Sequence, residues 1–136
     1  MQYEEFVAEV QRRADLPTAL KAQQAIQATL QTLAAYISRK ERHDAASQLP
    51  KGIKTYLQRP LLSPEKRLGP GPGSPVTADE FFWWVSTLEG VPLEVAREHA
   101  RAVMSVLRDA LSQGEFEDIR AELPAPIYNE FYEDKK

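Results

Sequence analysis

The sequence lacks cysteine entirely, has only two histidines and contains no long run of apolar residues. Without cysteine the chain cannot form a disulfide framework, a thiolate metal site, an iron–sulfur cluster or a cysteine nucleophile. No window approaches the roughly 18 uninterrupted apolar residues of a membrane-spanning helix, so we expect no contact with a membrane interior. The start of the chain, Met1 to Phe6, is acidic and amphipathic. Because a secretory signal is basic and then apolar, we expect a cytoplasmic protein.

The 136 residues that are present have the composition of a folded protein. Hydrophobic residues make up 43% and charged residues 27% of the chain, which argues against wholesale disorder. A chain of this length fits one compact domain, or two small repeats that share one core.

An internal repeat is the most specific feature of the sequence. The segment from Glu4 to Val10 matches the segment from Asp79 to Val85, which lies 75 residues later. After one deletion the offset becomes 74, and Ser38, Glu41, Asp44, Leu49, Pro50 and Ile53 align with Ser112, Glu115, Asp118, Leu123, Pro124 and Ile127. Because matches in this order over about fifty residues exceed chance, we interpret the chain as a tandem duplication.

Each repeat is predicted to be a succession of helices. Apolar residues recur at helical spacing over residues 3–14, and again over 22–37 and 96–111. Pro17 and Pro92 are predicted to stand in the first turn of the second helix of each repeat, where a missing N–H costs nothing. No stretch alternates with period two for long enough to indicate a strand. The predicted fold is all-α, with three to four helices in each repeat and both repeats packed into one helical bundle.

Capping boxes mark three of the predicted helix starts. Segments 38–41 and 112–115 both read Ser-x-x-Glu, and segment 77–80 reads Thr-x-x-Glu. In a capping box the hydroxyl accepts from an early backbone N–H while the glutamate reaches back to the cap. The third helix of each repeat is expected to end before Pro50 and Pro124, with a short fourth helical turn closing the repeat.

A segment rich in proline and glycine separates the repeats. The predicted organisation is repeat 1 at 1–58, a linker at 59–76, repeat 2 at 77–132 and a charged tail at 133–136. The linker holds five of the ten prolines and three of the six glycines, so we expect it to be exposed and partly extended. Its Gly69–Gly73 run is not a phosphate cradle, because Pro70 and Pro72 remove the N–H donors that a phosphate needs.

These features resemble a bacterial family of short helical proteins catalogued as a domain of unknown function. The resemblance rests on Glu4-Glu5-Phe6 with Val10, on the alanine-rich second helix, and on the runs 100–107 and 115–124. It covers nearly everything except the linker. It implies an all-helical tandem-repeat fold and a bacterial source, and it implies no activity, since it brings no catalytic or ligand residues with it.

We expect no catalytic, cofactor or metal site. His43 and His99 have charged neighbours on predicted helices and are interpreted as solvent-exposed, and neither a Gly-x-Ser-x-Gly nor a His-Glu-x-x-His motif occurs. Acidic residues crowd one predicted helix at Glu115, Glu117, Asp118 and Glu122. An EF-hand loop is missing, and one regular helix cannot wrap its own side chains around an ion. The prediction is a non-enzymatic protein without cofactors.

Charge is divided unevenly along the chain. Residues 1–68 hold 11 Lys+Arg against 7 Asp+Glu, whereas residues 69–136 hold 6 against 13. The basic excess forms what we call the basic stretch: Arg39, Lys40, Arg42, Lys51, Lys54, Arg59, Lys66 and Arg67. We interpret the asymmetry as attraction between the two halves, within one chain or head-to-tail between chains. The alternative is an anionic partner such as nucleic acid.

The aromatic run from Phe81 to Trp84 is the most unusual local feature. Phe81 and Phe82 match the core residues of the first repeat, whereas Trp83 and Trp84 match Ala8 and Glu9. Building the fold therefore does not require either tryptophan. We predict that Trp83 and Trp84, with Phe82 as a third candidate, contact a protein partner or a second copy of the chain. The alternative is that the linker or the other repeat covers both tryptophans.

Overall fold

The computed structural model describes residues 1–59 and 76–132, and this part of the chain contains helices and no strands. The all-α prediction is confirmed for these residues. Positions 60–75, which include most of the predicted linker with Lys66 and Arg67, lie outside the described residues. The predicted tail at 133–136 lies outside them as well.

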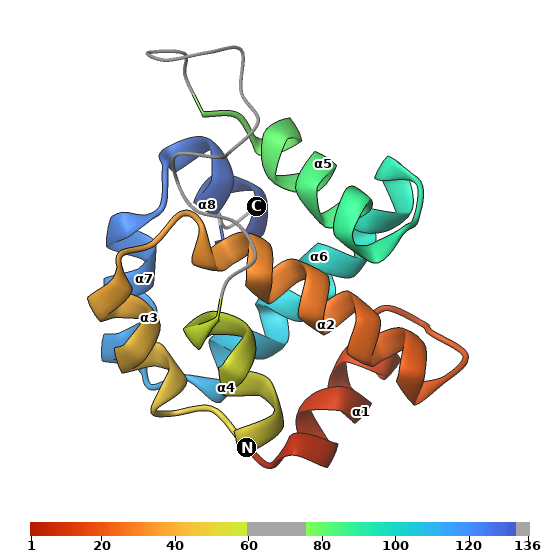
Figure 1. The fold of residues 1–136 in the computed structure, drawn as a ribbon, viewed down its shortest axis with the longest axis horizontal. Helices are drawn as coiled ribbons and strands as arrows, with labels where there is room; N and C mark the ends of the chain where they lie inside the picture. The colour runs from red at the N-terminus through yellow and green to blue at the C-terminus, as the bar shows by residue number, and fades with distance from the viewer. Residues whose placement is uncertain (60–75, 133–136) are drawn as a thin grey trace.

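The described helices fall into two sets, one on each side of residues 60–75 (Figure 1). The first set is α1 (Tyr3–Arg13), α2 (Ala19–Ala34), α3 (Arg39–Ala46) and α4 (Lys51–Gln58). The second set is α5 (Ala78–Glu89), α6 (Leu93–Ala110), α7 (Gln113–Glu122) and α8 (Ala125–Tyr132). The predicted fourth helical turns are helices of 8 residues each.

The two long helices, α2 and α6, lie against each other at the centre (Figure 1). The first helix of each set packs on its own long helix and also on that of the other set: α1 contacts α2 and α6, and α5 contacts both as well. Helix α4 covers α2, α8 covers α6, and α3 lies beside α7 at one edge of the bundle. The two sets therefore interlock around one core.

The predicted apolar faces fill this core. Phe6, Val10, Phe81 and Val85 are completely buried. Every residue from 28 to 37 is buried, because α1, α4, α5 and α6 all pack against α2. A helix that is buried on all sides must be mostly apolar all round, which explains the run of alanine, leucine and isoleucine there.

Hydroxyl side chains begin three helices where the sequence predicted them. The side chains of Ser38, Thr77 and Ser112 each accept a hydrogen bond from the backbone N–H three residues later, at 3.1, 3.1 and 3.2 Å. These bonds satisfy donors that the first turn of a helix cannot pair internally. The predicted starts of α3, α5 and α7 are confirmed.

The proline positions differ from the prediction. Pro17 lies before α2, because the hydroxyl of Thr18 caps that helix by accepting from the Lys21 N–H at 3.2 Å. Pro92 is the N-cap residue of α6 and precedes its first turn. Between α5 and α6 the chain turns at Gly90, whose φ of 76° is left-handed and disfavours any residue with a Cβ.

Candidate functional site

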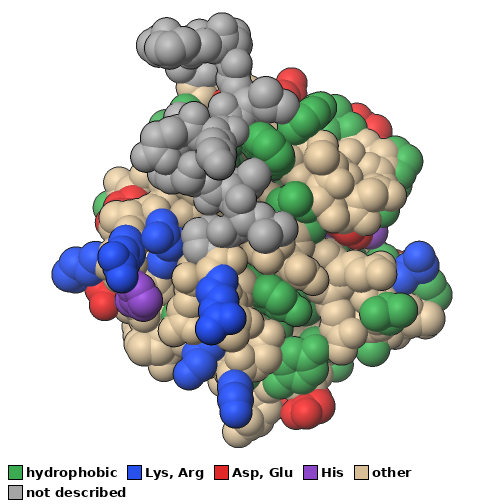
Figure 2. Space-filling model, viewed as in Figure 1, with side chains coloured by type: hydrophobic (Ala, Val, Ile, Leu, Met, Phe, Trp, Pro, Cys, Tyr) green, Lys and Arg blue, Asp and Glu red, His purple; other side chains and the backbone are tan. Residues whose placement is uncertain are grey.

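Two adjacent tryptophans on α5 differ in their exposure. Trp83 is 42% exposed, and Trp84 is partly buried against the edge of the core. Their rings are nearly perpendicular, at 83°, with centroids 5.0 Å apart. We call this pair the tryptophan surface. Figure 2 shows further apolar side chains at the molecular surface along α5.

The opposite side of α5 anchors this helix in the core. The rings of Phe81 and Phe82 meet the ring of Phe131 edge to face, at centroid distances of 5.4 and 5.6 Å. The guanidinium of Arg97 lies 4.6 Å from the centre of the Phe82 ring. Phe82 is completely buried and cannot touch a partner, so it drops out of the predicted contact surface.

A small pocket lies between α2 and the end of α5. Leu88 lies one helical turn beyond Trp84, and with Glu89 it forms the α5 wall of a pocket of about 190 Å³. The opposite wall belongs to α2 and consists of Gln24, Gln27, Ala28 and Gln31. The indole N–H of Trp84 is itself buried and has no hydrogen-bond partner among the described residues. Neither tryptophan lines the pocket itself, whose α2 wall is largely polar.

A buried hydrogen bond joins α5 to α6 beside this pocket. His99, predicted to be solvent-exposed, is only 8% exposed, and its Nδ1 lies 2.5 Å from a carboxylate oxygen of Glu89. Burial raises the pKa of Glu89, and the hydrogen bond from His99 opposes that shift. The prediction for His99 is wrong because it considered only the neighbours of His99 along α6. His43 is exposed on α3, as predicted.

The described members of the basic stretch lie on α3 and α4 and at the end of α4. Figure 2 shows lysine and arginine side chains gathered over this part of the surface. Arg39, Lys51, Lys54 and Arg59 form no hydrogen bond or ion pair through their side chains with any residue that the structure describes. Within the described residues, the acidic half of the chain therefore does not neutralise these four charges.

Two members of the basic stretch have local partners. Arg42 donates hydrogen bonds to the carbonyl oxygens of Ala34 and Ile37, at 3.3 and 3.2 Å, and thereby caps the end of α2. Lys40 lies 3.0 Å from a carboxylate oxygen of Asp44, one turn away on the same helix. Arg42 has a structural role, and Lys40 is partly neutralised.

One ion pair connects the two halves within the described residues. The guanidinium of Arg13 in α1 donates to Asp109 at 2.7 Å and to the hydroxyl of Ser105 at 3.1 Å, both in α6. The expected attraction between a basic and an acidic half thus acts through Arg13 in this part of the chain. Arg13 lies outside the basic stretch.

Glu122 of α7 bonds the start of α3, and Gln48, which follows α3, bonds the start of α7. The Ser38 backbone N–H and hydroxyl donate to the two carboxylate oxygens of Glu122, at 2.6 and 2.9 Å. Conversely, the Ser112 backbone N–H donates to the Gln48 side-chain oxygen at 2.7 Å, and the Gln48 amide donates to the Ser112 hydroxyl at 3.1 Å. We call these four residues the crossed caps. In a capping box, a glutamate of the same helix accepts the hydrogen bond from the backbone N–H of the cap residue. Here Glu122 and Gln48 accept those bonds instead.

The displaced capping-box glutamates meet between α3 and α7. Glu41 and Glu115 are 5% and 9% exposed, and one oxygen of each is buried without a hydrogen-bond partner among the described residues. With exposed Asp118 they offer carboxylate oxygens within 4.8 Å of one another. We call these three the carboxylate cluster. Glu41 is not among the acids grouped from the sequence, although its alignment with Glu115 was a usable signal.

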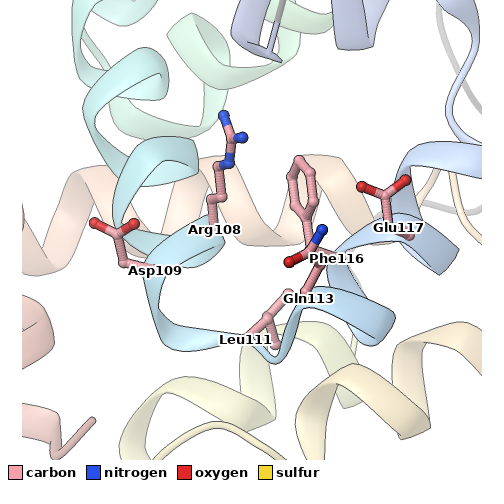
Figure 3. A pocket seen from close by; sticks show the side chains of 6 residues that line it. All are labelled: Arg108, Asp109, Leu111, Gln113, Phe116 and Glu117. Carbon is pink, nitrogen blue, oxygen red and sulfur yellow. The ribbon is translucent and has the colours of Figure 1, made fainter.

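Two of the acids grouped by the sequence analysis lie elsewhere. Glu122 belongs to the crossed caps. Glu117 borders an open pocket of about 330 Å³ where α6 meets α7, drawn in Figure 3 with Arg108, Asp109, Leu111, Gln113 and Phe116. The guanidinium of Arg108 lies 4.9 Å from the centre of the Phe116 ring, whereas Asp109 points away from that ring (Figure 3). The ionisable groups of this pocket therefore do not converge on one point.

Comparison with known proteins identifies a family and no activity. The model of the family described as "Uncharacterized conserved protein (DUF2267)" matches residues 3–129. No curated protein matches the chain. Among the described residues, no helix is long and apolar enough to cross a membrane.

Proposed function

We propose that this chain, which belongs to the DUF2267 family of uncharacterized conserved proteins, is a non-enzymatic interaction module that binds a second copy of itself. The exposure of Trp83, at 42%, on a helix whose opposite side builds the core is the observation that carries this proposal. We place the protein in a bacterial cytoplasm, on the family resemblance and the composition described above.

The module is proposed to be a duplicated helical repeat. Among the described residues, four helices precede residues 60–75 and four follow them, and in each set the second helix is the longest. Ser38 and Ser112 cap the third helix of each set at aligned positions. The crossed caps join aligned residues, since Gln48 and Glu122 are also 74 positions apart. A reciprocal arrangement of this kind is what two repeats related by an approximate two-fold axis produce.

The tryptophan surface is the proposed docking site. Residues that dominate protein interfaces are enriched in tryptophan, because a large rigid ring buries much apolar area at little entropic cost. The fold gains little from Trp83, because Phe81, Phe82 and Val85 already fill the core side of α5. The small pocket between α2 and α5 offers room for a partner's side chain at Leu88, one helical turn beyond Trp84.

The distribution of charge favours a second copy of the chain as the partner that binds the tryptophan surface. The tryptophan surface belongs to the acidic half of the chain, whose residues 69–136 hold 6 Lys+Arg against 13 Asp+Glu. Apart from Arg42 and Lys40, the basic side chains of α3 and α4 have no hydrogen-bond or ion-pair partner among the residues that the structure describes. Head-to-tail contact places the acidic half of one copy against the basic face of the next. Such a contact joins different surfaces, so it builds rings or open chains.

Light scattering coupled to size-exclusion chromatography tests this proposal. We expect the mass to rise above the 15.4 kDa of one chain as the protein concentration increases. Trp83→Ala should weaken association about thirtyfold, the effect of losing a central interface side chain, with unchanged helix content. Leu20→Ala is the matched control, because Leu20 is 62% exposed on α2 and lies outside the tryptophan surface. A mass that stays at one chain at every concentration refutes self-association.

Nucleic-acid binding is the second candidate, favoured by the charges of Lys51 and Lys54, which have no ion-pair partner among the described residues. Fluorescence anisotropy with a labelled duplex distinguishes the two proposals, since phosphate binding weakens steeply as salt rises. Lys51→Glu together with Lys54→Glu should abolish such binding, whereas Trp83→Ala should leave it intact. No binding at low salt rules this candidate out.

A further inference from the structure

The carboxylate cluster has properties that the crossed caps and the interaction module do not explain. Glu41 comes from α3, and Glu115 and Asp118 come from α7, so the cluster joins the two halves of the chain. The side chains of Glu41 and Glu115 are both more than nine-tenths buried. Both residues belong to the cluster, and one carboxylate oxygen of each is buried without a hydrogen-bond partner among the described residues.

Such an arrangement is unfavourable unless something neutralises it. A buried polar atom without a partner loses the hydrogen bonds of water, and carboxylates placed side by side repel each other. The pKa of Glu115 reflects both effects: burial raises it, and the charges of Asp118 and Glu122 raise it further. The charge of Lys40 opposes these effects.

The described side chains do not supply the missing positive charge within bonding distance. Lys40 is engaged by Asp44 at 3.0 Å, and its side chain is 87% exposed. The position that aligns with Lys40 in the second half is Gly114, so Asp118 has no lysine one turn before it, as Asp44 does. Asp118 forms no ion pair with any described residue. Three carboxylates thus face a single, already occupied lysine.

We propose that Glu41, Glu115 and Asp118 bind a hard divalent cation that bridges α3 and α7. All three ligands are carboxylate oxygens, the donors that Ca²⁺, Mg²⁺ and Mn²⁺ prefer. Oxygens on opposite sides of Ca²⁺ are about 4.8 Å apart and those around Mg²⁺ about 4.2 Å. The oxygens of the cluster lie within 4.8 Å of one another, close to the span of either ion's ligand shell. Water completes the coordination on the side where Asp118 is exposed.

The cation is bound independently of the proposed self-association. The cluster lies between α3 and α7, whereas Trp83 and Trp84 lie on α5. The bridge fastens the edge where the crossed caps already join the two halves, so binding should raise the melting temperature of the whole chain.

Titration calorimetry of the full chain, stripped with a chelator and titrated separately with Ca²⁺, Mg²⁺ and Mn²⁺, tests the proposal. We expect saturable binding of at least one ion to a single site. Glu115→Gln and Glu41→Gln should weaken that binding about tenfold or more, since each removes a charged ligand. Glu117→Gln is the matched control, because Glu117 is an exposed acid on the same helix outside the cluster and its loss should change nothing.

Paramagnetic broadening locates the site independently of the variants. Mn²⁺ added to the isotope-labelled wild-type chain should broaden backbone amide signals in α3 and α7 first and leave those of α5 sharp. Absence of saturable binding by the wild type at millimolar concentrations of all three ions overturns the proposal. So does broadening that starts elsewhere, or binding that survives both glutamine variants. In each case no ion bridges α3 and α7 through the carboxylate cluster.

Discussion

Replacing Ser38 and Glu122, singly and together, measures how strongly the crossed caps hold the two halves together. In the native protein Ser38 donates twice to Glu122, at 2.6 and 2.9 Å, and accepts from the Glu41 N–H at 3.1 Å. Ser38→Ala removes the cap and one of the two bonds to Glu122, so we expect a loss of about 1–2 kcal/mol. Glu122→Ala keeps the cap but removes both bonds, and because Glu122 is exposed we expect a loss of about 1 kcal/mol.

The double variant decides whether the two residues act through each other. Its loss should be smaller than the sum of the single losses by about 0.5–1 kcal/mol, since both single changes break the same bond. Urea denaturation followed by circular dichroism gives the free energies of unfolding. Ser112→Ala combined with Glu122→Ala is the control pair, because Ser112 is bonded to Gln48 and its loss should simply add. A coupling between Ser38 and Glu122 no larger than in that control refutes the crossed cap as a source of stability.

Further changes test other parts of the structure. Gly90→Ala should destabilise the protein by about 1 kcal/mol because φ is 76° there, whereas Gly114→Ala, in helix α7 with open space around it, should stabilise it by about 0.5 kcal/mol. Denaturant melts that show the same sign for both would contradict this backbone argument. Burial raises the pKa of Tyr132, so the unfolded chain loses this proton first and stability should fall above about pH 10. Tyr132→Phe should lessen that fall, and at pH 7 it should cost about 1 kcal/mol for the lost 3.3 Å bond to Met104. The raised pKa of Glu89 makes the native state bind more protons between pH 4.5 and that pKa, so stability should decline as pH rises through this window. Glu89→Gln should abolish that decline in melts between pH 5 and pH 7.

Local signals in the sequence predicted the helices well. The starts at Ser38, Thr77 and Ser112 followed from side chains that act within one turn of the backbone, and the structure contains those bonds. The buried positions of Phe6 and Phe81 followed from helical periodicity. Such features depend on residues close together in the chain, which is why the sequence alone was sufficient.

The candidate sites depended on residues that are distant in sequence. Glu41 and Glu115 were read as capping-box residues, but Glu122 and Gln48 reach across from the opposite half and bond the same serines. Nothing local distinguishes these competitors from ordinary surface residues. His99 was misjudged for the same reason, since its burial comes from α5 and its partner Glu89. Packing between the halves decided each of these cases.

The interlocking of the two helix sets constrains how the newly made chain folds during synthesis. When residues 1–59 have left the ribosome, α2 has α1 and α4 as neighbours, and its sides toward α5 and α6 are still uncovered. Those apolar sides stay open until the second half has been translated, a period in which chains aggregate or are held by chaperones. Core formation must then close a long loop between α2 and α6, which slows folding relative to a bundle of sequence neighbours.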